Sequence, residues 1–174
     1  MSKAFLRESD FPDPSDQPPA IPTLEPGTKN YLTAAGAQHL RDELARRLEQ
    51  ERPGLVGQDD PEAKRDLQAL DRKIRQLQQS LRSAEIVAIP PEAARDRVRF
   101  GATVTVQEPG AGESRYRIVG VDETDFGRDG ISWQSPLAKA LLHARPGDDV
   151  EVPTPKGPRK LRVARIEYPT AMAP

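Results

Sequence analysis

Leucines recur every four residues near the start of the chain, at Leu40, Leu44 and Leu48, and charged residues fill most positions between them. This spacing places the leucines on one stripe of a helix, and Thr33 is suited to cap the first turn. The segment Arg52-Pro53-Gly54 should weaken or end the helix, because proline removes a backbone hydrogen bond and glycine favours non-helical backbone. The pattern therefore predicts a first helical arm that ends near Arg52.

A second helical pattern begins at Asp60-Pro61, where an N-cap residue precedes a proline in the first helical position. Its apolar residues repeat at intervals of three and four, as in a coiled-coil seam: Leu67, Leu70, Ile74, Leu77, Leu81 and Ala84. Two such helices joined by a loop of about eight residues predict an antiparallel coiled-coil hairpin. The alternative, a helix pair inside a larger core, does not fit the charged outer faces of both helices.

The pattern changes from helical to alternating after Pro90-Pro91. Strands are expected where apolar and polar residues alternate, at 103–106, 116–121, 151–152 and 161–168. Ser135 followed by Pro136 predicts the start of one short helix.

The apolar residues of the last strand change phase after Val163, which predicts a β-bulge near Ala164 or Arg165. Together the patterns predict an α+β protein. It combines an N-terminal antiparallel coiled-coil hairpin with a C-terminal antiparallel β domain that carries one short helix.

The first 27 residues contain six prolines, five acidic residues and few large apolar side chains. Such a composition does not offset the entropy lost on ordering, so we expect a disordered tail. The expected boundaries are a tail at 1–27, a hairpin at 28–89, a linker at 90–97 and a β domain at 98–168.

The chain has no cysteine and two histidines, which argues against a disulfide and against a zinc site. No N-terminal apolar segment or membrane-length apolar run is visible, so a cytoplasmic protein without membrane contact is expected. Its 26 basic and 27 acidic residues give a net charge of −1. A protein that grips free DNA or RNA by its phosphates would show a positive excess, so a protein partner is expected instead.

The densest motif is Phe126-Gly127-Arg128-Asp129 followed by Ile131-Ser132-Trp133-Gln134-Ser135-Pro136-Leu137-Ala138-Lys139-Ala140-Leu141-Leu142. With the lead-in Thr28-Lys29-Asn30-Tyr31-Leu32-Thr33 and the ending Arg165-Ile166-Glu167-Tyr168, it resembles the bacterial GreA/GreB transcript-cleavage factors, and the GreB branch most. The resemblance runs from about Thr28 to Tyr168. It implies an FKBP-like domain that docks on bacterial RNA polymerase, and a hairpin that enters the secondary channel through which nucleotides pass. A monomeric regulator of transcription elongation, and not an enzyme, is expected.

The resemblance places the polymerase-docking surface on the short helix and the residues before it: Asp129, Trp133, Ser135, Pro136, Leu137, Ala138 and Lys139. Four basic residues of the second arm are candidates for contact with the channel or nascent RNA: Lys64, Arg65, Arg72 and Lys73. Plainer explanations are a helix packed on the sheet and a solvated charged face. A single tryptophan fits an interface anchor and core filling equally well.

In the family that this chain resembles, an aspartate and a glutamate at the hairpin tip hold a magnesium ion in the polymerase active site. That ion activates the water that cuts backtracked RNA. The corresponding stretch here is Gly57-Gln58-Asp59-Asp60-Pro61-Glu62-Ala63, in which the spacing from Asp59 to Glu62 matches. Three positions depart from the family's pattern: Gln58, Pro61 and Ala63. The tip is therefore interpreted as a degraded metal site.

Asp60 and Glu62 also suit an ordinary helix start, because a side-chain oxygen caps the first turn and a negative charge favours the positive end of the helix dipole. No resident metal or cofactor is expected, and magnesium would bind weakly and only within a polymerase complex. Each arm is also shorter than in the family by about seven residues, or about 10 Å. We therefore expect little stimulation of RNA cleavage.

Three alternatives stay open at this point. The chain could be a true cleavage factor whose docking restores the reach of the tip. It could resemble the short-hairpin regulator of nucleoside diphosphate kinase, which has the same two-part plan. It could be a peptidyl-prolyl isomerase or chaperone, but an isomerase pocket needs apolar and aromatic lining, and the β domain has few aromatic residues to spare.

Overall fold

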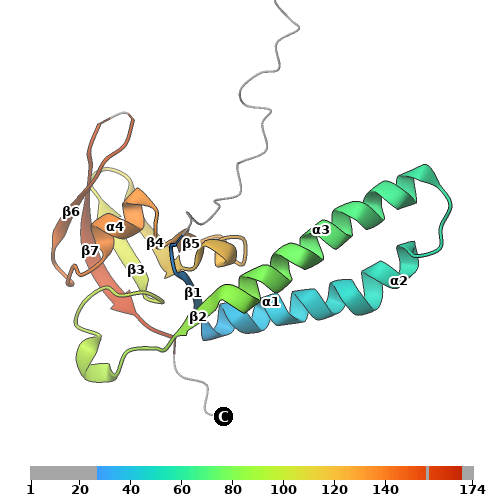
Figure 1. Cartoon of the computed structure of the whole chain (residues 1–174). Coiled ribbons are helices and arrows are strands. Elements are labelled where there is room, and N and C mark those ends of the chain that lie inside the picture. Colours follow the sequence, from blue (N-terminus) through green and yellow to red (C-terminus); the bar gives the residue numbers. More distant parts are fainter. Residues whose placement is uncertain (1–26, 156, 170–174) are drawn as a thin grey trace, which may run out of the picture.

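A computed structural model describes residues 27–155 and 157–169 of the chain. A helical hairpin projects from a β domain, and the chain enters and leaves the hairpin at the same end, beside the domain (Figure 1). The expected disordered tail at 1–27 lies outside the described residues, except for Gly27. Within the described part of the chain, no helix is long and apolar enough to cross a membrane.

The first arm of the hairpin runs further than its sequence predicts. It consists of α1 (Ala34–Arg46), the π-helical turn η2 (Arg47–Glu51) and α2 (Arg52–Leu55). Pro53 therefore lies inside the arm and does not end it. The preceding π-helical turn accommodates it, because hydrogen bonds there run to residue i−5, as from Arg52 to Arg47, which relieves the clash of a proline ring with the carbonyl of residue i−4. The connecting loop shortens accordingly to residues 56–60.

The second arm, α3 (Pro61–Ser83), begins as predicted. Asp60 caps it, since its side chain accepts a hydrogen bond of 3.2 Å from the backbone N–H of Ala63. The buried residues of the predicted seam are Leu70, Ile74 and Leu77. Whether the pairing is a true coiled coil stays a prediction.

Two residues of the predicted apolar stripes behave differently. Leu48 is 39% exposed, because it lies in the π-helical turn, where the wider turn rotates side chains away from the α-helical stripe. Ala84 does not extend the helical seam but begins the strand β2 (Ala84–Val87).

β2 pairs in parallel with β1 (Asn30–Thr33), and this two-stranded sheet was not predicted. The register sets Asn30 opposite Ala84 and Thr33 opposite Val87. One strand leads into the first arm and the other follows the second. The small sheet therefore closes the base of the hairpin against the β domain (Figure 1).

The β domain contains a five-stranded sheet in the order β5-β4-β3-β7-β6. Its strands are β3 (Thr103–Glu108), β4 (Gly112–Val119), β5 (Gly130–Ser132), β6 (Asp149–Val152) and β7 (Arg159–Glu167). β5 runs parallel to β4, so the sheet is mixed and not purely antiparallel as expected. A crossover through the short 3-10 helix η4 (Val121–Glu123) makes this possible, since a tight hairpin joins only antiparallel strands.

The predicted bulge is confirmed in β7. Thr105 of β3 lies opposite Arg165, whereas the next residue, Val106, lies opposite Val163. Ala164 is therefore left without a partner, which moves the apolar residues on its two sides to the same face of the sheet.

The core lies between this sheet and α4 (Pro136–Leu141). Ala138 and Leu141 of the helix are buried together with Val104, Ile118 and Val163 of the sheet. The linker contains a 3-10 turn, η3 (Glu92–Ala94). The protein is thus a mixed helix and sheet structure, and the FKBP-like arrangement of its β domain stays a prediction.

Candidate docking surface, hairpin tip and joint

The three acids of the hairpin tip serve separate purposes. Asp59 is fully exposed and pairs with Lys64 at 3.0 Å. Asp60 is the cap of α3, and Glu62 lies exposed in the first turn of that helix. Among the described residues, no group of three or more acidic, histidine or cysteine side chains is arranged to hold a metal ion. The tip geometry is that of a helix start.

The chain reverses at Gly57, whose φ of +86° lies in the left-handed region that favours glycine. The side-chain amide of Gln58 donates a hydrogen bond to the backbone carbonyl of Gly54 at the end of the first arm. Val56 beside it is 50% exposed. Gln58, which follows the glycine of the motif, therefore closes the loop with its side chain.

The four basic candidates on α3 do not form one patch. Arg65 and Arg72 are exposed, whereas Lys64 is held by Asp59. Lys73 is half-buried and faces the first arm, where it lines a cleft. Within the described part of the chain, Arg65 and Arg72 are therefore the two of these candidates that are exposed and form no ion pair.

The docking candidates on α4 divide into surface and core. Ser135 caps the helix by accepting a hydrogen bond of 3.1 Å from the N–H of Ala138, and Pro136 and Lys139 are exposed. Leu137 is half-buried against the core. The side chain of Ala138 is fully buried, so it packs the domain and is not available to a partner.

Trp133 contacts the base of the hairpin. Its ring packs edge-on against Tyr31 of β1 with 5.3 Å between ring centroids, and Phe100 lies 6.0 Å from the same tyrosine. Trp133 therefore links the β domain to the base of the hairpin. Its ring is half-buried, so part of it stays exposed at the surface.

Asp129 also lies near the hairpin. It lines a small cavity of about 130 Å³ together with Gly36 and His39 of α1 and with Phe126. The rings of His39 and Phe126 are 4.0 Å apart between centroids. The sequence-predicted docking residues thus occupy two places, the start of α4 and the junction with α1.

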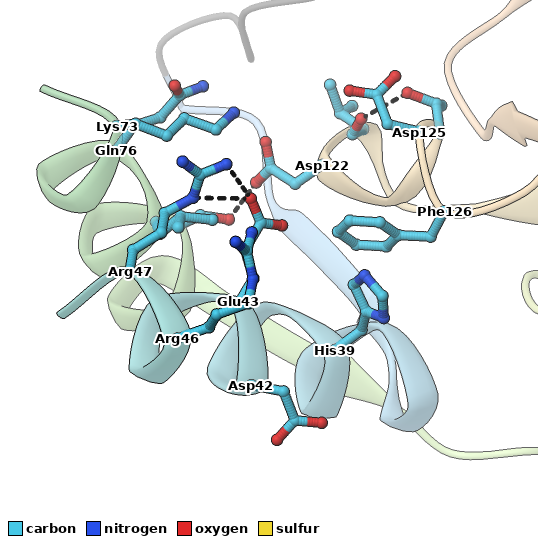
Figure 2. A pocket seen from close by; sticks show the side chains of 14 residues that line it. His39, Asp42, Glu43, Arg46, Arg47, Lys73, Gln76, Asp122, Asp125 and Phe126 are labelled. Carbon is cyan, nitrogen blue, oxygen red and sulfur yellow. Dashed lines mark hydrogen bonds and ion pairs between the residues drawn. The ribbon is translucent and has the colours of Figure 1, made fainter. Parts of the chain in front are cut away.

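A cleft of about 670 Å³ separates the lower hairpin from the loop around η4, and no sequence pattern indicated it. Figure 2 shows cationic side chains on the hairpin side and Asp122 and Asp125 on the loop side. The cations are Arg46, Arg47 and Lys73.

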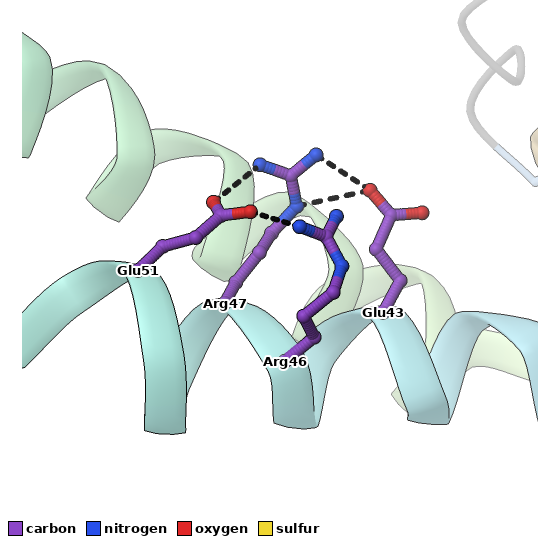
Figure 3. A network of polar contacts seen from close by, with 4 residues as sticks. All are labelled: Glu43, Arg46, Arg47 and Glu51. Atoms are coloured by element: carbon purple, nitrogen blue, oxygen red, sulfur yellow. Dashed lines mark hydrogen bonds and ion pairs between the residues drawn. The ribbon is translucent and has the colours of Figure 1, made fainter.

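The two arginines of this cleft are already paired with acids of their own arm (Figure 3). Arg47 donates to Glu43 at 2.9 and 2.6 Å and to Glu51 at 3.3 Å, and Arg46 also bonds Glu51. These contacts span the π-helical turn. The arginines therefore stabilise the arm and leave little positive charge for an anionic ligand.

A buried polar cluster joins the hairpin to the β domain. Glu123 of η4 is 4% exposed and accepts hydrogen bonds from the N–H and the hydroxyl of Thr33, at 2.7 and 2.5 Å. It also accepts one of 3.1 Å from the N–H of Gly120. The sequence marks Thr33 as a helix cap but carries no local signal for its partner, which lies 90 positions away.

Comparison with known proteins gives one consistent result. Residues 92–168 match the family model described as "Transcription elongation factor, GreA/GreB, C-term". The chain is 39% identical over 155 residues to transcription elongation factor GreB of Neisseria meningitidis serogroup B, covering 81% of this chain and 95% of that protein. It is 31% identical over 152 residues to transcription elongation factor GreA of Francisella tularensis subsp. novicida, covering 79% and 95%.

Among solved structures, the chain is similar to the GreA factor homolog Gfh1 of Thermus thermophilus, with 29% sequence identity and a TM-score of 0.37. The match covers 80% of this chain and 99% of that one.

Proposed function

This chain belongs to the GreA/GreB family of transcription elongation factors, and on that premise we propose that it binds bacterial RNA polymerase and regulates elongation. The β domain docks on the enzyme, and the hairpin enters the secondary channel. The observation that carries the proposal is the 155-residue alignment, which spans both the hairpin and the β domain of a GreB protein. The exposed start of α4, with Pro136 and Lys139, supports the docking surface.

We further propose that the protein stimulates RNA cleavage weakly or not at all. Asp59 and Glu62 are exposed and Asp60 caps α3, so among the described residues the tip acids are not gathered into a metal site. The shorter arms also leave the tip about 10 Å from where the family's acids reach. A misplacement of about 1 Å can cost on the order of 100-fold in rate, so this deficit outweighs the matching spacing of Asp59 and Glu62.

Polymerase binding by the β domain is tested by exchanging two charges. Asp129→Lys combined with Lys139→Glu keeps the net charge and should weaken binding to core polymerase without unfolding the protein. The control is Glu113→Lys with Lys160→Glu, a charge exchange on β4 and β7 that removes the exposed ion pair of Lys160 with Glu151 and should bind like the wild type. Deletion of the hairpin should retain most of the affinity. Loss of binding on that deletion, with the Asp129 and Lys139 exchange harmless, would show that the docking surface is wrongly assigned.

Cleavage is tested on a stalled transcription complex containing backtracked RNA. The wild type should bind and compete with a cleavage-active relative, yet release little cleaved RNA itself. Asp59→Ala with Glu62→Ala should leave its effect on transcription nearly intact. Robust cleavage by the wild type that disappears in this double variant would identify Asp59 and Glu62 as magnesium ligands and the protein as a true cleavage factor.

Two other candidate functions receive less support. A proline isomerase needs an aromatic pocket, but Phe100 and Trp133 pack against Tyr31. A regulator of the nucleoside diphosphate kinase type shares the two-part plan, and capture of core polymerase by the purified protein separates it from the proposed function. The proposed activity on RNA polymerase is regulatory and depends on that partner.

A further inference from the structure

The polar groups buried in this protein are concentrated at one place. Among the described residues, five polar or charged residues are buried, and four of them lie where the hairpin meets the β domain: Asn30, Thr33, Ser80 and Glu123. Apolar contacts tolerate sliding and rotation, whereas buried hydrogen bonds require one geometry, because an unpaired buried polar group is costly. The hydrogen bonds of the joint therefore favour one relative orientation of the hairpin and the β domain.

Glu123 holds the start of α1 from the other side of the joint. Its carboxylate accepts from the N–H and the hydroxyl of Thr33, and the hydroxyl oxygen in turn accepts from the N–H of Gly36 at 2.9 Å. A negative charge at this end of a helix also interacts favourably with the helix dipole. The first arm thus receives its cap through an acid of the β domain.

Two glycines let the parts approach this closely. A Cβ atom at Gly36 would lie 1.9 Å from Oε2 of Glu123, and one at Gly120 would lie 2.2 Å from the backbone carbonyl oxygen of Tyr31. Both distances are far below van der Waals contact. The Glu123 side chain and the η4 backbone therefore approach the hairpin more closely than a side chain at either glycine would allow.

A second tie reaches the other arm. The side-chain amide of Asn30 donates to the carbonyl oxygen of Ser80 at 3.2 Å and to Asp122 at 3.2 Å, and the hydroxyl of Ser80 also bonds Asp122. Asp122 and Glu123 are neighbours in η4. The short helix η4 of the β domain therefore bonds to both arms of the hairpin: Glu123 binds the start of the first arm, and Asp122 binds the second.

We propose that Asp122 and Glu123 are positioning residues that set the direction in which the hairpin projects. The inference rests on the proposed function and deepens it, because a hairpin that enters a channel must be aimed by the domain that docks outside. α3 has 23 residues, about 35 Å of helix, so a tilt of about 10° at the joint moves the tip by about 6 Å. Loosening the joint therefore changes where the tip arrives, while the exposed start of α4, with Pro136 and Lys139, keeps its shape.

The joint is tested directly by a distance measurement between spin labels. The sequence has no cysteine, so Gln68→Cys on α3 and Ser114→Cys on β4, both exposed, accept one label each. The otherwise native protein should give one narrow distance distribution. Asp122→Ala with Glu123→Ala should broaden it by about twofold or more, as expected for an arm released at a hinge. The control Asp125→Ala removes an exposed acid of the same loop and should change nothing.

A conservative variant separates hydrogen bonding from simple loss of packing. Glu123→Gln keeps an acceptor for the N–H of Thr33 and places an amide against the hydroxyl oxygen, so it should retain a narrow distribution. Gly36→Ala should broaden the distribution in the wild-type background by displacing the carboxylate, yet add little to Glu123→Ala, where that carboxylate is gone. A narrow distribution in both Glu123→Ala and the double variant, with native circular dichroism, would overturn the proposal. If the double variant does not fold, the single variants decide.

The functional consequence is measured with polymerase. Glu123→Ala should keep its dissociation constant for core polymerase within about threefold of the wild type. Its hairpin-dependent effect on elongation should fall by about tenfold, because the tip arrives out of place. Equal loss of binding and effect would contradict a positioning role. Failure of the wild type to bind polymerase would reject the proposed function, while the spin-label distances would still decide whether Asp122 and Glu123 orient the hairpin.

Discussion

At the scale of single residues, Gly120 offers the sharpest test of the packing at the joint. Gly120→Ala would drive a methyl group to 2.2 Å from the carbonyl oxygen of Tyr31, which is backbone and cannot rotate away. We expect a loss of about 1–3 kcal/mol in the free energy of unfolding, as for other overpacked sites. Gly54→Ala is the matched control, since it lies in α2 with open space around it and should gain up to about 1 kcal/mol from helix propensity. Denaturant unfolding gives the free energy of unfolding of both variants. Equal values would show that the β1 backbone shifts at little cost to make room for the methyl group.

At the scale of elements, the two arms are joined near the tip by an ion pair. Arg52 of α2 donates to Asp71 of α3 at 2.8 Å, and this hydrogen bond holds the pKa of the Asp71 carboxyl below its usual value. A lowered pKa in the folded state adds stability above the unfolded pKa, and that stability is lost as the pH falls through the folded value.

Asp71→Asn should therefore lower the melting temperature slightly at pH 7, and the difference from the wild type should shrink as the pH falls below about 4. The effect is small because both side chains are partly exposed. Thermal melts at several pH values measure it, with the exposed Asp66→Asn as control. An Asp71→Asn variant that melts higher than the wild type at pH 7 would mean that the carboxylate destabilises the pair of arms.

At the scale of the whole molecule, the described residues already contain the two buried clusters that hold the structure together. Removing residues 1–27 should consequently leave the melting temperature nearly unchanged, because that segment offers little apolar surface to bury. A calorimetric scan of the trimmed protein checks this. A fall of many degrees would show that the segment packs on the rest of the chain.

Local patterns were enough for much of the fold. The cap at Asp60, the cap at Ser135 and the bulge at Ala164 are where the sequence predicts them, because each depends on residues within a few positions of one another. The sequence placed the end of the first arm too early, near Arg52, and the reason for this error is also local. A π-helical turn accommodates Pro53, and no simple residue pattern announces such a turn.

The candidate site could be predicted only in part. The resemblance of the 126–142 segment to its family pointed to α4, and the exposure of Pro136 and Lys139 agrees with a surface there. The resemblance could not show that Ala138 is buried or that Trp133 contacts Tyr31. Residue type and spacing say which side chains a helix carries, whereas the packing partner decides which of them remain free.

The sequence by itself determined the helices, most of the strands and the family, since periodicity, caps and motifs depend on residues that are close together in the chain. Tertiary structure alone decided the parallel pairing of β1 with β2, the direction of β5 and the joint at Glu123. The contact between Thr33 and Glu123 joins residues 90 positions apart. Such contacts form only when the fold brings distant segments together, so no local pattern encodes the angle at which this hairpin leaves its domain.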